Sequence, residues 1–190
     1  MSGMSSQEAV LPGSSPRSDN AVDGVPIRGG KFLTFFLAGE EYGIEILKVH
    51  EIIGMMPITS VPRTPESFRG VINLRGKVIP IVDLRSKFGM EPKEPTAETC
   101  IIVVNVQGLV MGVVVDCVSE VLNIAAEEIE DAPSFGTDIH TNYILGIGKS
   151  QGRVKILLDI GKVMENQELA SQSWEAGGNS GSELQSSAAG

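Results

Sequence analysis

The chain has 190 residues with a formal net charge of −9 at pH 7, and 42% of them are hydrophobic. This length and composition predict one or two small globular domains with a real core. The acidic balance argues against nucleic acid or an anionic membrane as the main partner, because both require a basic surface. Cys100 and Cys117 show no CxxC spacing and have no histidine nearby, so neither a disulfide framework nor a zinc site is predicted.

The sequence predicts no targeting or membrane segment. The first 20 residues lack a cationic start followed by an apolar run, and nowhere do about 18 apolar residues follow one another. We therefore expect a cytoplasmic protein without direct membrane insertion. Residues 1–30 and 165–190 are poor in apolar side chains, which predicts a disordered N-terminal tail and a disordered or partly helical C-terminal tail. Trp174 lies in the second tail, as a docking motif or the stub of a last helical turn.

Between these tails, short β-branched runs are separated by Gly or Pro every eight to twelve residues, a pattern typical of barrels and sandwiches. The predicted strands, in chain order, are residues 32–37, 42–46, 70–74, 78–82, 100–106, 110–115, 144–147 and 154–158. Short helices are predicted over residues 47–53 and after three aspartates that can cap the N–H groups of the following turn, namely Asp83, Asp116 and Asp159.

The sequence also contains an internal repeat. At an offset of 69 residues the matching pairs include Gly39 with Gly108, Val49 with Val118, and Glu51 with Glu120; at an offset of 76 they include Gly70 with Gly146, and Asp83 with Asp159. Two equivalent halves are implied, about residues 31–97 and 98–164, and the change of offset places an acidic surface loop between residues 122 and 143. Each half is small enough to be marginal alone, so the halves should pack on each other, and an exchange of strands between them stays open.

No pattern of catalytic or metal-binding residues is present. The two histidines, His50 and His140, are 90 residues apart, and no phosphate-binding loop or nucleophile elbow occurs. A hydrolase acting through Ser119 or Cys117 would lack a positioned base. The acidic run at residues 127–131 lacks the spacing of a calcium loop. We predict no catalytic residue, no metal site and no cofactor.

Charge is unevenly distributed along the chain. Residues 59–87 hold six bases and two acids, whereas residues 116–138 hold seven acids and no base. A surface of two signs suits oriented contacts with other proteins. Nucleic-acid binding by the basic segment is an alternative, but that segment lacks interleaved exposed aromatic residues that would stack on bases. Arg75 lies at the expected turn of a hairpin over residues 70–84, either as a surface turn residue or as a rigid donor fork for a partner.

Four stretches resemble the CheW family of bacterial chemotaxis coupling proteins. They are residues 41–53 (EYGIEILKVHEII) and 70–88 (GVINLRGKVIPIVDLRSKF) in the first half, and 110–122 (VMGVVVDCVSEVL) and 143–148 (YILGIG) in the second. The resemblance covers about residues 31–164 with both halves in order. It implies a mainly β fold of two tandem five-stranded Src-homology-3-like β-barrels packed side by side, with short helices.

This resemblance implies an adaptor without catalysis. One surface would bind the regulatory domain of the histidine kinase CheA, and another the cytoplasmic tip of methyl-accepting chemotaxis receptors. Rings of kinase and adaptor would link receptors into membrane-attached arrays, and self-association in such rings stays open. A coupling protein of the same fold serving another chemosensory pathway, in surface motility or gene regulation, is the alternative.

Carried over position by position, the resemblance assigns a receptor-binding groove between the barrels to Val49, Glu51, Gly70, Arg75, Val118 and Val121. Apolar contacts would supply affinity as a receptor helix lies in the groove, and Arg75 would supply orientation. Each valine could instead be an ordinary core residue. Phe135, in the acidic loop, matches a family position that meets the kinase. An aromatic residue in such a loop is expected to fill a local core or a partner pocket, and we favour the partner.

Overall fold

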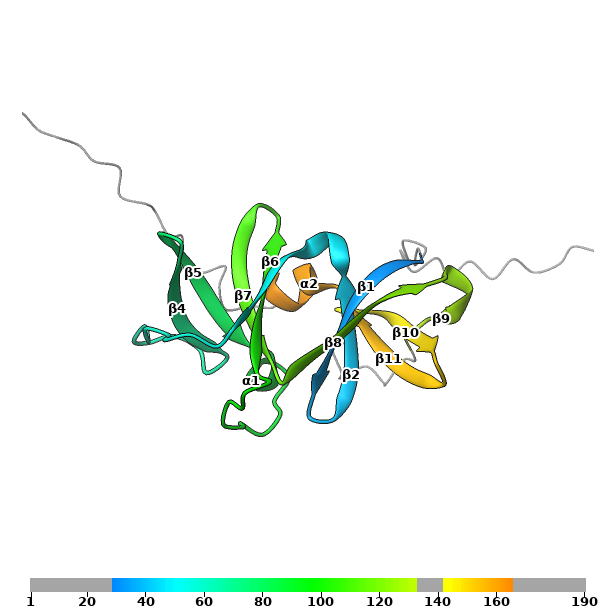
Figure 1. The fold of residues 1–190 in the computed structure, drawn as a ribbon, viewed down its shortest axis with the longest axis horizontal. Helices are drawn as coiled ribbons and strands as arrows, with labels where there is room; N and C mark the ends of the chain where they lie inside the picture. Colours follow the sequence, from blue (N-terminus) through cyan, green and yellow to red (C-terminus); the bar gives the residue numbers. More distant parts are fainter. Residues whose placement is uncertain (1–28, 133–141, 166–190) are drawn as a thin grey trace, which may run out of the picture.

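A computed structural model describes residues 29–132 and 142–165 of the chain (Figure 1). Of the segments expected to be tails, residues 1–28 and 166–190, with Trp174, lie outside these residues, as does the position of Phe135, whereas Gly30 begins the first strand and Glu165 ends the last helix. The described residues form two mainly antiparallel sheets that lie side by side, with a few short helices and 3₁₀ turns between or after the strands (Figure 1). This confirms the predicted mainly β fold, which fits two Src-homology-3-like domains.

The six-stranded sheet has the order β8-β1-β2-β11-β10-β9. Its strands are β1 (Gly30–Leu37), β2 (Glu40–Glu45), β8 (Cys117–Ile124), β9 (Ile129–Glu130), β10 (Ile144–Ser150) and β11 (Arg153–Leu158). The five-stranded sheet has the order β3-β6-β7-β5-β4. Its strands are β3 (Val49–Gly54), β4 (Phe68–Leu74), β5 (Lys77–Asp83), β6 (Cys100–Val106) and β7 (Leu109–Val115).

Each sheet takes strands from both halves of the sequence repeat. The hairpin β1-β2 lies in the six-stranded sheet, where β2 pairs in parallel with β11. The hairpin β6-β7 lies in the five-stranded sheet, where β7 pairs in parallel with β5. The two halves have therefore exchanged their first hairpins. A parallel pair needs a long connection, and residues 46–152 connect β2 to β11 while residues 84–108 connect β5 to β7.

The exchange explains why several strands are apolar without alternation. Along β6, Ile101 and Val103 face the interior of the five-stranded barrel, whereas Ile102 and Val104 face a core shared by both sheets. A strand buried on both faces reads as a continuous apolar run. We call the shared cluster the central core; it includes Leu33, Phe35, Leu37, Tyr42, Ile44, Val82, Ile102, Val104, Met111, Val113 and Val115.

Two of the three predicted aspartate caps are confirmed. The Asp83 carboxylate accepts hydrogen bonds from the backbone N–H groups of Arg85 and Ser86 at the start of α1 (Leu84–Lys87). The carboxylate of Asp159 accepts from the N–H groups of Gly161 and Lys162 in α2 (Ile160–Glu165). Both contacts satisfy N–H groups that have no partner within the helix.

Two helix predictions are wrong. Residues 47–53 contain only the end of a 3₁₀ turn, η1 (Ile46–Lys48), followed by β3, because this segment pairs with β6 and half-buries alternate residues. No helix follows Asp116; β8 does, paired with β1. A second 3₁₀ turn, η2 (Ala126–Glu128), connects β8 to β9. Pairing between distant strands outweighed the local helix signals.

Candidate interaction surface

The predicted groove residues lie on three sheet-edge strands. Val49 and Glu51 lie on β3, Gly70 and Arg75 lie on β4 and its turn, and Val118 and Val121 lie on β8. The strands β3 and β4 are the two edges of the five-stranded sheet, and β8 is one edge of the six-stranded sheet. Edge strands present unpaired backbone groups and side chains to partners.

Glu51 and Arg75 are joined directly, in a paired hydrogen-bonded contact between the two edges of the five-stranded sheet. The Arg75 nitrogens Nη1 and Nη2 donate to the Glu51 oxygens at 2.7 and 2.8 Å. These bonds hold the pKa of the Glu51 carboxyl below its usual value and raise the pKa of Arg75. The Arg75 side chain is 72% exposed and that of Glu51 only 21%. The carboxylate thus holds the guanidinium in one direction while leaving much of it open to a partner.

The backbone conformation of Arg75 recurs in each of the four tight hairpin turns of the described residues, so it does not distinguish the candidate site. Arg75 has a φ of 52°, and Gly76 follows at 84°. The other three hairpins turn at Ala38-Gly39, Gln107-Gly108 and Gln151-Gly152, whose first residues have φ values of 52°, 52° and 54°. Such turns require positive φ at both central residues. The exposed ion pair, rather than backbone strain, distinguishes Arg75.

Gly70 is buried and serves backbone packing. Its φ is 134°, and a Cβ atom at this position would overlap the carbonyl oxygen of Thr59. Thr59 forms an isolated antiparallel bridge with Val71, and both backbone N–H groups donate across it at 2.8 and 2.9 Å. The chain between β3 and β4 therefore approaches β4 closely at Gly70.

The three valines differ in their surroundings. Val49 and Val118 are half-buried and pack against the central core, so each is partly the core residue that the sequence left open. Val121 is 50% exposed and pairs with Leu33 of β1. A β-bulge lies beside each set, between Val49 and Glu51 on β3 and between Val118 and Val121 on β8. Bulges change the direction of side chains and end regular pairing.

At the second bulge, Thr34 replaces the missing ladder bonds. Its buried hydroxyl donates to the carbonyl oxygen of Glu120 at 3.0 Å and accepts from the Glu120 N–H at 3.3 Å. The two halves therefore share a β-bulge beside Glu51 and beside Glu120, but the ion pair of Glu51 with Arg75 is not repeated. The position equivalent to Arg75 is Gln151, which carries no charge. The candidate surface is consequently asymmetric.

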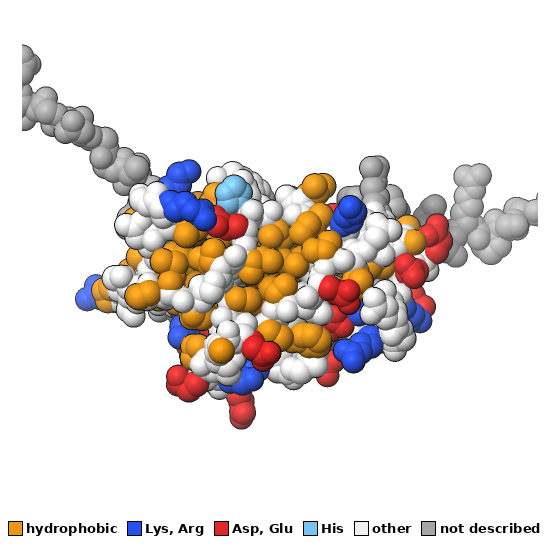
Figure 2. Space-filling model, in the orientation of Figure 1, with side chains coloured by type: hydrophobic (Ala, Val, Ile, Leu, Met, Phe, Trp, Pro, Cys, Tyr) orange, Lys and Arg blue, Asp and Glu red, His pale blue; other side chains and the backbone are white. Residues whose placement is uncertain are grey.

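Exposed apolar side chains that the sequence did not single out flank these positions. Leu47 is 93% exposed on η1, and Ile52 is 45% exposed on β3. The incorrect helix over residues 47–53 hid both from sequence reasoning, because a helix would have turned one of its faces inward. Figure 2 shows hydrophobic side chains gathered across the centre of one face, with charged groups mainly around them.

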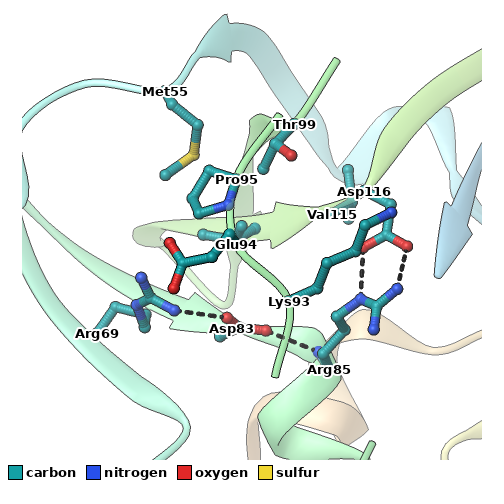
Figure 3. A pocket seen from close by; sticks show the side chains of 11 residues that line it. Met55, Arg69, Asp83, Arg85, Lys93, Glu94, Pro95, Thr99, Val115 and Asp116 are labelled. Carbon is teal, nitrogen blue, oxygen red and sulfur yellow. Dashed lines mark hydrogen bonds and ion pairs between the residues drawn. The ribbon is translucent and has the colours of Figure 1, made fainter. Parts of the chain in front are cut away.

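A small polar pocket lies elsewhere, between the loop at residues 93–99 and the five-stranded sheet (Figure 3). Arg85 donates to both Asp116 oxygens at 2.6 Å, and Arg69 donates to Asp83 at 3.1 Å. Asp116 also accepts from the N–H group of Ala38 at 2.9 Å. The Arg85 hydrogen bonds lower the pKa of Asp116. Asp116 thus ties the crossing between β7 and β8 to α1 and to the β1-β2 turn, and none of the predicted groove residues lines this pocket.

Ion pairing reduces the charge asymmetry expected from the sequence. Among the bases between residues 59 and 87, Arg69 is paired with Asp83, Arg75 with Glu51 and Arg85 with Asp116. On the acidic side, Glu130 pairs with Lys149 at 2.6 Å. The basic segment is therefore less basic on the surface than its composition indicates.

The described residues offer little for catalysis. Burial raises the pKa of the Cys117 and Cys100 thiols, which favours their unreactive protonated forms. Ser119 is an exposed residue of β8 rather than part of a helix. Over residues 29–132 and 142–165, no group of three or more His, Cys, Asp or Glu side chains could hold a metal ion, and no helix is long and apolar enough to cross a membrane.

This chain is similar in sequence and in structure to known proteins of one family. The sequence model of the CheW-like domain matches residues 31–168. The chain is 45% identical to "Chemotaxis protein CheW" of Klebsiella aerogenes over 142 residues, which are 75% of this chain and 86% of that protein. It is 33% identical to the Bacillus subtilis protein of the same name, over 73% of this chain and 89% of that one.

A solved structure agrees with these relatives. The scaffolding protein TtCheW from Thermoanaerobacter tengcongensis superposes with a TM-score of 0.67 at 37% sequence identity, covering 73% of this chain and 94% of that chain. The matched region contains both sheets and all three edge strands that carry the candidate surface. The chain belongs to the CheW family.

Proposed function

We propose that this chain is a non-catalytic adaptor of bacterial chemotaxis that couples methyl-accepting chemoreceptors to the histidine kinase CheA. It acts from the cytoplasm and is recruited to membrane-attached receptor arrays. The observation that carries the proposal is the exposed Arg75 guanidinium, oriented by Glu51, in a chain of the CheW family.

The receptor tip would bind on the side formed by β3, β4 and β8. Ile52 and Val121 are about half exposed and give the apolar contact that a helix in a groove requires. Arg75 gives direction, because a fixed donor fork recognises a carboxylate or a helix-terminal carbonyl in one orientation. Val49 and Val118 would anchor the edge strands β3 and β8 that carry Ile52 and Val121, since both valines pack on the central core.

The kinase would bind a different part of the chain. Phe135 is the residue we assign to this contact, because an aromatic side chain is a frequent anchor of protein interfaces. Separate sites let one adaptor hold receptor and kinase together. Self-association of the adaptor in array rings is part of the same proposal, and no nucleic acid is required.

Two binding titrations with the full chain test the receptor part. We expect Val121→Asp to weaken binding of a purified receptor signalling domain by about tenfold or more, because it places a charge in an apolar contact. Leu109→Asp is the matched control, since Leu109 is 54% exposed on the other sheet and Val121 is 50% exposed. Equal affinities for the two variants would contradict the assigned surface.

A parallel titration tests the kinase part. Phe135→Ala should weaken binding of the CheA regulatory domain by about tenfold while leaving receptor binding unchanged. If the chain binds neither CheA nor chemoreceptors but binds the kinase of a surface-motility or gene-regulatory system, the alternative pathway replaces the proposed one and the adaptor role stands.

A further inference from the structure

Lys155 and Glu41 form a buried ion pair that no proposed interaction uses. The Lys155 Nζ atom donates to Glu41 at 2.9 Å, and the two side chains are 1% and 6% exposed. Lys155 lies on β11 and Glu41 on β2, immediately before the residues at which these strands pair in parallel. The pair therefore sits on the seam where the exchanged hairpin β1-β2 joins the second half.

The equivalent seam of the five-stranded sheet is apolar. By the repeat, Glu41 corresponds to Val110 (offset 69) and Lys155 to Ile79 (offset 76). The ladders agree with this alignment, since the pair Leu157 and Gly43 corresponds to Ile81 and Gly112. Ile79 is buried in the core of the five-stranded sheet, and Val110 packs against it.

This difference between the two seams distinguishes the observed strand pairing from the most similar alternative, in which the hairpins are not exchanged. Without exchange, β2 would pair with β5 and β7 with β11. Glu41 would then lie beside Ile79, and Lys155 beside Val110. Lys155 would then be buried without a charged partner, and Glu41 would lie in the half-buried apolar position of Val110, so each charge would lose contact with water without gaining a partner. Only the observed exchange brings the two charges together.

We propose that the Lys155–Glu41 pair selects the strand exchange between the two halves, acting as a specificity device for folding rather than as a source of stability. Replacement of buried ion pairs by apolar residues is often neutral for stability or favourable. A buried polar contact can nonetheless decide which of two similar arrangements forms. The inference rests on the sheet topology alone and is independent of the proposed adaptor function.

The test replaces the pair with the residues of the other seam, in the full chain. The double variant Glu41→Val with Lys155→Ile and the wild-type protein are unfolded in urea and refolded by dilution. Backbone nuclear Overhauser effects between β2 and β11 report the observed pairing, and those between β2 and β5 report the competitor. We expect the double variant to keep the wild-type urea midpoint or exceed it, but to lose about half or more of its correctly paired monomer.

The reversed pair, Glu41→Lys with Lys155→Glu, is the control and should refold like the wild-type protein. Three results would overturn the proposal. The double variant could refold with wild-type yield to the observed pairing alone; it could be much less stable than wild type or fail to fold, which would make the pair a stabilising contact; or the reversed pair could lose as much yield as the double variant.

Discussion

Arg75 and Glu51 are the two predicted site residues that the structure joins by direct bonds. The sequence left Arg75 open as either a surface turn residue or a rigid donor fork, and the resemblance assigned both Arg75 and Glu51 to the groove. Their bond could not be inferred from sequence, because it depends on the closure of the five-stranded barrel at β3 and β4. The sequence could not decide whether Val49 and Val118 are core or surface residues. Both are half-buried, because they lie on edge strands and pack against the central core.

Removal of the Arg75 fork should affect binding rather than folding. We expect Arg75→Ala to leave the Tm almost unchanged, because an exposed ion pair contributes little to stability. Receptor-domain affinity should fall by about tenfold, with Arg75→Lys intermediate, since lysine keeps the charge but not the planar fork. Lys77→Ala, two residues away on the same hairpin, is the control. An unchanged affinity of Arg75→Ala in a calorimetric titration would remove Arg75 from the site.

Asp116 should make stability depend on acid pH. Its pKa is lowered in the folded protein, chiefly by the Arg85 hydrogen bonds, relative to an unfolded value of about 3.9. The stability that this carboxylate contributes is present above the unfolded pKa and is lost as the pH falls through the lower folded pKa. Urea unfolding between pH 7 and pH 3 should therefore show a weaker acid dependence in Asp116→Asn.

Asp116→Asn should also lower the free energy of unfolding at pH 7 by about 2 kcal/mol, since Arg85 is left half-satisfied in a partly buried position. Asp131→Asn, at an exposed carboxylate, is the control. If both variants follow the wild-type acid profile, the carboxylates that drive acid unfolding lie elsewhere.

Strands and turns were predictable where the pattern is local, and misjudged where distant pairing decides. The strands of the four hairpins with glycine in their turns were predicted from the spacing of apolar runs and glycines, and the hairpin over residues 70–84 was predicted as such. The segment at residues 47–53 and the segment after Asp116 form β3 and β8, whose pairing partners β6 and β1 are far away in sequence. Two glycines of the same hairpin are needed for different reasons. Gly70 allows close packing against Thr59, whereas Gly76 is needed only for its positive φ.

Gly70→Ala should be much more destabilising than Gly76→Ala. Both residues have positive φ, but a Cβ atom meets the Thr59 carbonyl at Gly70 and open space at Gly76. Strain alone costs about 1 kcal/mol, and backbone overlap adds about 2 kcal/mol or more. Thermal unfolding of the two variants measures the difference. Similar Tm values would show that the segment before β4 moves away without cost.

For the whole molecule, the repeat indicated two equivalent halves, and the resemblance supplied the barrels and the family. Which hairpins are exchanged could not be read from the repeat, because both arrangements satisfy the same apolar pattern. The Lys155–Glu41 pair favours one of the two arrangements, but this could be recognised only once the strand order was known. The charge asymmetry was overestimated because sequence counting cannot show internal ion pairs such as Arg85–Asp116.

A reconstitution tests the adaptor role most directly. Receptor signalling domains are attached to vesicles, CheA is added, and ATP-dependent phosphate flux is followed with and without this protein. We predict strong kinase activation that needs all three components and is lost with Arg75→Ala but kept with Lys77→Ala. Kinase activity that is the same in the presence and absence of this protein, with a receptor and kinase known to respond to another coupling protein, would contradict the account.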